Sequence, residues 1–143
     1  MGFTNDLVAG LAQLLEDEGL GSWDPAGTYA PGVVGIYVDA VPEDRPDLIT
    51  LTAYPVAEDL HGPAVLGVQV RTRRASPDPR PVRDLDDAIM TGLHGRRGVM
   101  LGSVYVSHIV WQSGSSLGQD QAKRWSRTSN YYLHTSRPSP HRF

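Results

Sequence analysis

The chain has 143 residues, a net charge of −3 and no cysteine, and these properties exclude several classes of protein. Without thiols there are no disulfides and no thiolate metal sites, and a mildly acidic chain gives no global case for nucleic-acid binding. No apolar run approaches the roughly 20 residues that span a bilayer, and the start, with an early Asp6 and no basic leader, does not read as a signal peptide. We therefore expect one soluble domain with a real core and no membrane contact.

The first predicted element is a helix over residues 4–18. Its apolar positions recur every three or four residues, as they do on one face of an amphipathic helix: Leu7, Val8, Leu11, Leu14 and Leu15. Thr4 or Asn5 can cap the start of this helix. Gly19 suits the left-handed residue that ends it.

Two short strands follow a loop over residues 19–32, which is rich in glycine and proline. We expect Trp23 and Tyr29 to hold this loop against the edge of the core. In residues 33–38 and 48–54 the apolar side chains alternate with the others, which is the period of a strand with one buried face.

A third strand and a second helix form the unit around which we expect the fold to be organised. The strand starts at Val65; Leu66, Val68, Val70 and Thr72 fall on one face, and Gln69, Arg71 and Arg73 fall on the other. The helix is predicted over residues 79–94, with Asp78 as its cap, Pro79 in its first position and Gly95 after its end. Its apolar face comprises Val82, Leu85, Ile89 and Leu93.

The last part of the chain predicts two further strands, over residues 99–111 and 125–135. The stretch between them, residues 112–124, is polar and has almost no apolar anchor except Leu117. Hairpin loops usually have about 2–5 residues, so we expect this longer stretch to be a loop that is mobile in the free protein and ordered in an assembly. The tail, residues 137–143, has two prolines and is expected to extend onto a neighbouring molecule.

These elements predict an α+β fold in the order α-β-β-β-α-β-β. Two main helices would pack on a mostly antiparallel sheet of about five strands, because short turns join neighbouring strands. The domain would span residues 1–136, followed by the extended tail.

A search for catalytic or metal-binding patterns finds none. The five histidines are scattered, and none forms a recognisable metal-ligand motif with another histidine or a carboxylate. Asp59 and His61 are two residues apart in a predicted loop, which by itself does not make a catalytic pair. Nucleotide-binding loops and a nucleophile elbow are also missing from the sequence. We therefore predict no catalytic, cofactor-binding or metal-binding residues, and we interpret His108, in the middle of a predicted strand, as a packed or interface residue.

Two charged clusters of opposite sign remain as candidates for contact with partners. Arg71, Arg73 and Arg74 end the third strand, where charge can simply protect a sheet edge or can pair with an acidic partner. Nucleic acid is the third interpretation, because no aromatic residues alternate with these arginines in the sequence. The stretch Glu16–Glu18 ends the first helix, where the dipole disfavours negative charge.

Several short motifs, in their order and spacing, resemble the tail terminator or minor capsid proteins of long-tailed bacteriophages. The motifs are Gly19-Leu20-Gly21 with Trp23, Val68-Gln69-Val70-Arg71, Leu93-His94-Gly95, Trp111-Gln112, Leu117-Gly118-Gln119-Asp120 and Ser129-Asn130-Tyr131-Tyr132. Together they cover most of the chain.

The resemblance implies a structural virion protein and no catalysis. Such proteins form a ring, usually a hexamer, that caps the tail tube and joins it at the head–tail junction to the head-side connector or stopper protein. DNA would pass through the lumen without sequence-specific binding, and assembly would take place in the host cytoplasm. A head completion protein is the alternative, and a small enzyme or nucleic-acid-binding domain is a more distant one.

A ring needs two different patches that meet across each interface. The candidate interface residues are Glu16, Asp17, Glu18, Arg71, Arg73, Arg74, Gln112, Leu117, Gly118 and Asp120.

Overall fold

The computed structural model describes residues 2–59 and 63–136. The helices are α1 (Phe3–Asp17) and α2 (Arg80–Leu93), and the strands are β1 (Ser22–Trp23), β2 (Gly35–Val38), β3 (Leu48–Glu58), β4 (Ala64–Arg74), β5 (Arg97–Leu101), β6 (Val104–Gln119) and β7 (Trp125–Thr135). The predicted tail, residues 137–143, lies outside the described residues. None of the described helices has the length and the apolar character that crossing a membrane requires.

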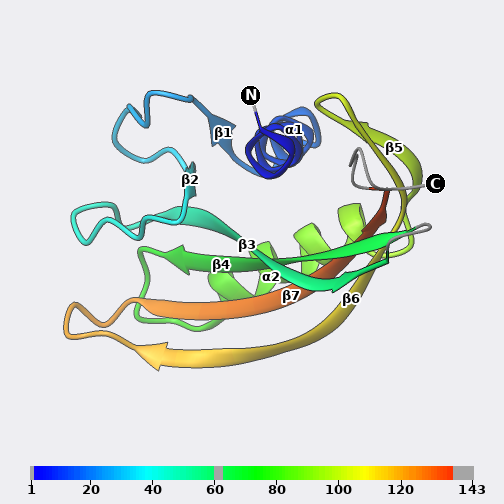
Figure 1. The fold of residues 1–143 in the computed structure, drawn as a ribbon. Helices are drawn as coiled ribbons and strands as arrows, with labels where there is room; N and C mark the ends of the chain where they lie inside the picture. Colours follow the sequence, from blue (N-terminus) through cyan, green and yellow to red (C-terminus); the bar gives the residue numbers. More distant parts are fainter. Residues whose placement is uncertain (1, 60–62, 137–143) are drawn as a thin grey trace.

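Within the described residues, the strands form one mixed sheet in the order β1-β2-β3-β4-β7-β6-β5 (Figure 1). Strands β1, β2 and β3 are parallel to one another, and every other pairing is antiparallel. The α+β class is therefore confirmed. Most pairings are antiparallel, as expected, but the expected number of about five strands and the order α-β-β-β-α-β-β are wrong. The loop after α1 adds the short strand β1, and residues 97–119 contain two strands where one was predicted.

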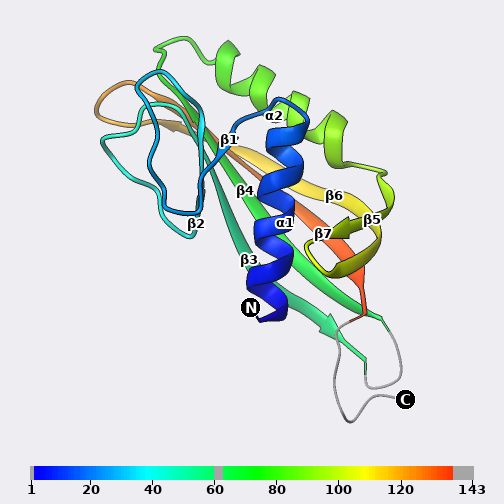
Figure 2. The same cartoon turned by 90° about the horizontal axis from the view of Figure 1, so that it is seen from above.

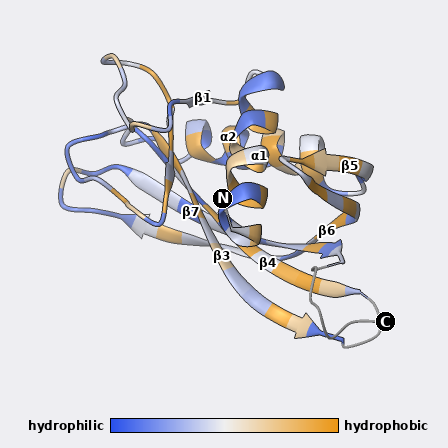
Figure 3. Cartoon of the chain, turned by 45° about the horizontal axis from the view of Figure 1, so that its top comes forward, coloured by the Kyte–Doolittle hydropathy of each residue, from blue (hydrophilic) through white to orange (hydrophobic). Residues whose placement is uncertain are grey.

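Both helices pack on the same face of the sheet, as seen from above in Figure 2. Polar and apolar residues alternate along each helix, and the apolar ones enter the core (Figure 3). Leu11 of α1 and Ile89 of α2 have no exposed surface, and they share one cluster with Val68 and Val70 of β4 and with Tyr131 of β7. The helices are those predicted from the apolar periods, with boundaries shifted by about one residue.

Among the described residues, the opposite face of the sheet, which we call the helix-free face, is covered at one end. There the residues between β2 and β3 fold over the start of β3, and Leu48 joins Tyr29 and Tyr37 in a second, smaller cluster. The Tyr29 hydroxyl donates to the carbonyl oxygen of Ile36 at 2.5 Å. Tyr29 therefore holds its loop on the core, as its position in the sequence predicts.

Helix α1 is held directly against the turn between β5 and β6. A Cβ atom on Gly10 would lie 2.2 Å from the backbone nitrogen of Gly102, so the two backbones are closer than any side chain allows. The Asp6 carboxylate accepts hydrogen bonds from both the backbone N–H and the hydroxyl of Ser103. Hydrogen bonding by Ser103 lowers the pKa of Asp6 below its usual value.

The prediction of one strand over residues 99–111 is wrong, because the chain reverses within it. Gly102, with φ +61°, and Ser103 form a tight turn, and Leu101 pairs with Val104 across it. A Gly-Ser pair between two apolar runs is a hairpin signal, and glycine reaches the positive φ without strain.

The prediction of a loop over residues 112–124 is also wrong for most of its length. Residues 112–119 continue β6 and pair with β7 as far as Gln119 opposite Trp125, and only residues 120–124 form the turn. The stretch lacks an apolar face because it is exposed on both sides of the sheet, so its strand character comes from the partner strand.

The helix caps differ from the sequence-based expectation at the start of both helices. The residue before α1 is Gly2, and no side chain caps that end, so Thr4 and Asn5 do not have the expected role. The residue before α2 is Pro79, and no side chain caps this helix either, so Pro79 is not in the first helical position and Asp78 is one residue too early to be the cap. The Asp78 carboxylate instead accepts a hydrogen bond from the backbone N–H of Arg80 at 2.9 Å.

We predict that Gly10→Ala destabilises the protein although alanine favours helices. The added methyl group meets the backbone of the β5–β6 turn, and overpacking of this kind costs about 1–3 kcal/mol. The matched control is Gly92→Ala in α2, where the nearest atom to the new Cβ would be a Leu20 methyl carbon at 3.6 Å. This control should gain up to about 1 kcal/mol from helix propensity. Urea denaturation measures both, and equal effects of the two changes would contradict the close contact.

Candidate functional site

Arg73 is the centre of a polar junction at the end of β4. Its side chain is on the helix-free face yet only 3% exposed, because the loop over residues 39–47 covers it. Its guanidinium donates to the carbonyl oxygens of Pro42 and Arg45. Burial, followed by repulsion from Arg124, lowers the pKa of Arg73 below its usual value. Arg73 therefore fastens this loop to the sheet.

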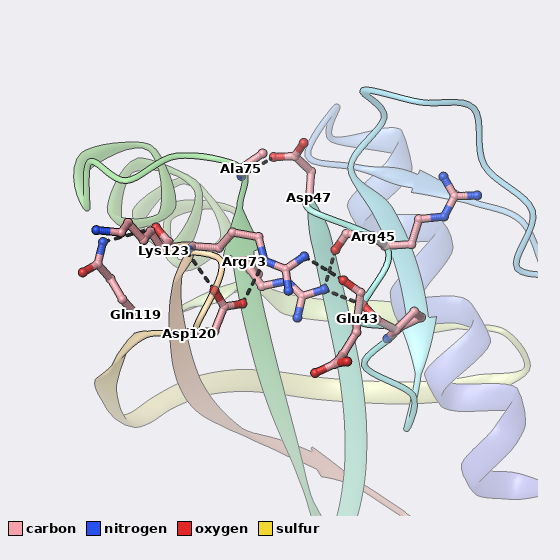
Figure 4. A network of polar contacts seen from close by, with 10 residues as sticks. Glu43, Arg45, Asp47, Arg73, Ala75, Gln119, Asp120 and Lys123 are labelled. Carbon is pink, nitrogen blue, oxygen red and sulfur yellow. Dashed lines mark hydrogen bonds and ion pairs between the residues drawn. The ribbon is translucent and has the colours of Figure 1, made fainter.

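Two ion pairs flank Arg73 and join the loop to its surroundings. Their carboxylates, Asp47 and Asp120, are labelled beside Arg73 in Figure 4. Arg74 contacts the Asp47 carboxylate at 2.7 Å, and the same carboxylate accepts from the backbone N–H of Ala75. On the other side, Arg124 contacts Asp120 at 2.8 Å within the β6–β7 turn and donates to the Glu43 carbonyl oxygen at 2.7 Å. The loop and the hairpin turn are therefore one connected polar structure.

An open depression of about 660 Å³ lies beside this junction. Its lining comprises Glu43, Gln119, Asp120, Gln121, Ala122 and Arg124. The backbone N–H and then the guanidinium of Arg124 lower the pKa of Asp120. The depression is open and is lined by carboxylates, amides and a guanidinium, so it can form hydrogen bonds with a polar surface. The described residues contain no group of three or more metal-ligating side chains placed to hold a metal.

The predicted arginine cluster is divided by the fold. Arg73 and Arg74 are bound within the chain, whereas Arg71 is half-buried on the helix-free face, and its Nε atom is buried without a hydrogen-bond partner. Asp120, predicted separately, belongs to the same end of the sheet as Arg73, and it acts electrostatically on that guanidinium.

The acidic end of α1 is also engaged within the chain. The Glu16 carboxylate accepts a hydrogen bond from the backbone N–H of Trp23 at 3.0 Å and another from Gln13. Asp17 accepts from the same glutamine side chain, and Glu18 pairs with Arg96. Glu16 and Glu18 therefore join α1 to the elements that follow it, which explains their presence at an end of the helix that disfavours them.

Gln112, Leu117 and Gly118 lie on the free edge of the sheet. Strand β5 pairs only with residues 104–108 of β6, so along residues 112–119 no described strand lies on the outer side of β6. Leu117 is 47% exposed at a break in the register, and Gly118 has a positive φ of +78°. The free edge carries neither charge nor proline, the two features that most often block edge pairing.

A stacked histidine pair on the helix-free face was missed by the sequence analysis. The rings of His108 and His134 lie 4.0 Å apart and are nearly parallel. The pair exists because the register of β6 against β7 shifts between Val106 and His108, and no sequence signal shows that shift. Arg97 of β5 is opposite His108, and Val65 of β4 is opposite His134.

The fold and the junction define an α+β protein with one half-covered sheet and a polar contact surface at its end. No protein-family model and no curated protein matches the chain. Among solved structures it is similar to a chain of the virion of a native gene transfer agent particle, with a TM-score of 0.60 and 11% sequence identity over 94% of this chain and 95% of that chain. The likeness shows that the two chains share a fold from end to end.

We predict that Arg73→Met destabilises the protein by about 1.5–3 kcal/mol, the range for hydrogen bonds to charged groups. Methionine fills most of the volume of the arginine stem but leaves the carbonyl oxygens of Pro42 and Arg45 without this donor. Arg83→Met, at an exposed position of α2, is the control and should change stability little. Denaturant unfolding compares the two, and equal stability would show that Arg73 does not hold the loop.

We predict that the protein loses stability as the pH falls below about 6.5. Burial and then the neighbouring His108 lower the pKa of His134 below its ordinary 6.5. Between the lowered pKa of the folded state and the ordinary pKa of 6.5, the unfolded chain binds the proton more readily than the folded protein does. The stabilisation that neutral His134 contributes is therefore complete above pH 6.5 and is lost as the pH falls through the folded-state pKa. Urea denaturation at several pH values should show a weaker dependence for His134→Gln, and an unchanged dependence would contradict this assignment.

Proposed function

We propose that this chain is a structural protein of a tailed-phage-like particle, and specifically a tail terminator. Copies of the chain form a hexameric ring that caps the tail tube and joins it to the head-side connector, while DNA passes through the lumen. The observation that supports this proposal most is the end-to-end fold similarity to a chain of a gene transfer agent virion. The order of the sequence motifs that resemble tail terminators supports it independently. The role requires no catalysis.

The unpaired outer halves of β3 and β6, on opposite sides of the sheet, differ from each other, as a head-to-tail ring requires. The outer half of β3 contains Pro55, a register break after it and the charged Glu58, all of which block strand pairing. The outer half of β6 has no charged residue, and Leu117 is exposed there. We place one patch of the subunit contact on residues 112–119, with the polar depression beside Asp120 at its end.

Electron microscopy of the purified full-length protein tests the ring, and sedimentation gives its mass. Rings of a single size with a central channel are expected. A monomer at every concentration, including in the presence of the tube protein, would overturn the ring.

Particles made without this protein distinguish a tail terminator from a head completion protein. Loss of a terminator leaves tubes of uncontrolled length that do not join heads. Loss of a head completion protein leaves tails of normal length beside heads that cannot receive them, and this result would transfer the proposal to the head side of the junction.

We predict that Leu117→Asp abolishes ring formation without loss of fold. The side chain is exposed in the monomer, so a charge costs little there, but the same charge is costly in a subunit contact. Met100→Asp, at a 56% exposed position of β5, is the matched control. Light scattering and thermal melting measure assembly and fold. If Met100→Asp abolishes the rings and Leu117→Asp keeps them, the contact lies on the β5–β6 hairpin.

A further inference from the structure

Acidic residues are almost absent from the sheet. The chain has 16 Asp and Glu residues, all within the described residues, and Glu58 is the single one that lies in a strand. The others lie on the helices, in the loops and at the turns. Arginines, in contrast, occur in β4, β5 and β7. A chain with a net charge of −3 therefore has its negative charge concentrated away from its strands.

The helix-free face shows this separation most clearly. The pairing of β3, β4 and β7 places on it a compact group of polar and aromatic side chains: Tyr54, Gln69, Arg71, Asn130, Tyr132 and His134. None of these residues is acidic, and each is half-buried, so each keeps part of its surface accessible. Beyond β7, the exposed Arg97 of β5 extends the basic character of this face past the His108–His134 pair.

The aromatic side chains on this face are held in fixed positions. The Tyr54 ring lies over Gly67, where a Cβ would stand 2.3 Å from a ring carbon, and its hydroxyl donates to the Asn130 amide oxygen at 3.2 Å. Tyr132 is opposite Gly67 on the other side of β4. Tyr54 and Tyr132 therefore lie on either side of Gly67, two residues along β4 from Gln69. These two tyrosines share the helix-free face with Arg71, which is four residues along β4 from Gly67.

Arg71 has hydrogen-bonding capacity that the chain does not use. Its side chain is half-buried, and its Nε–H is buried without a partner among the described residues. Thr50 and Thr128 are opposite Arg71 on the adjacent strands, and neither is acidic. A half-buried guanidinium on an accessible face is suited to an anionic partner, because it can donate to phosphate or carboxylate oxygens.

We infer that the helix-free face contacts the phosphate backbone of double-stranded DNA. The inference rests on the proposed function, in which the ring surrounds DNA, and it assigns this face to the lumen. Charge complementarity favours DNA over a protein partner, because a regular polyanion matches the part of this face on β3, β4 and β7, which has cations, amides and hydroxyls and no carboxylate. The carboxylates of Asp47 and Asp120 lie at the end of the face, beside Arg73. One arginine in each subunit gives few phosphate contacts, so binding is weak, independent of sequence and sensitive to salt.

Fluorescence anisotropy with a labelled DNA duplex of mixed sequence tests the inference over a range of salt concentrations. Arg71→Gln removes the phosphate contact and should weaken binding and reduce the salt slope by about 1 for each subunit engaged. Gln69→Glu adds the carboxylate that the face lacks, at constant size, and should also weaken binding. The matched controls are Arg83→Gln on α2 and Gln13→Glu on α1, both at exposed positions of the helix layer, and they should bind as the wild type does. Thermal melting confirms that every variant is folded.

The inference is overturned if both helix-free-face variants bind DNA as the wild type does, or if the controls weaken binding equally. It is also overturned if Gln69→Glu abolishes ring formation and leaves DNA binding intact, because the face is then a contact between subunits. Electron microscopy of the same samples separates the two proposals. Rings that do not bind DNA refute this inference alone, and a protein that binds DNA through Arg71 without forming rings refutes the ring alone.

Discussion

The rest of the structure depends on strand β4, which is paired on both sides along almost its full length. It pairs with β3 from Ala64 to Arg73 and with β7 from Ala64 to Arg74. This double pairing fixes its two faces, since a shift of one residue would move Val68 and Val70 out of the core. The same constraint fixes Gln69 and Arg71 on the helix-free face. The core and the proposed DNA contact are therefore set by one strand register.

The register of β4 also explains how a charged residue is tolerated inside the protein. Arg73 is on the same face as Arg71, but it lies where the loop over residues 39–47 crosses the sheet. A buried guanidinium costs less when its N–H groups are bonded, and the carbonyl oxygens of Pro42 and Arg45 provide these bonds. Two arginines with identical positions in the strand pattern thus have different roles, because a loop covers only one of them.

This difference marks the limit of what the sequence could predict. The apolar periods predicted α1 and α2, and they predicted the inner face of β4, since burial in one shared core produces them directly. The extension of β6 over residues 112–119 has no apolar period, because that stretch is exposed on both sides and takes its conformation from β7. The β5–β6 turn at Gly102 did have a local signal, which the longer apolar run around it obscured.

The candidate site was harder to predict than the fold, for the same physical reason. Arg71 and Arg73 are recognisable as basic residues, but their exposure depends on a loop about thirty residues earlier in the chain, a distance that no local pattern reports. Glu16 and Glu18 appear as a free acidic patch in the sequence, yet they bond to Trp23 and Arg96 in the fold. Local patterns predict on which face of a helix or strand a side chain lies. Tertiary contacts determine whether that side chain stays exposed and free to contact a partner.

The distribution of charge connects the proposed ring to the proposed DNA contact. A ring of identical subunits repeats each subunit's surface around its axis, so a carboxylate on the helix-free face would be repeated with it and would repel a central polyanion at every position. The helix layer, which carries the acidic residues of α1 and α2, would then face outward. In this arrangement the subunits meet through the outer half of β6, whose residues 112–119 carry no charge, and the exposed charged groups of each subunit face either the DNA or the solvent. In the proposed ring, one sheet therefore provides three separate surfaces: the edge of β6 for the subunit contact, the helix-free face for the lumen and the helix-covered face for the outside.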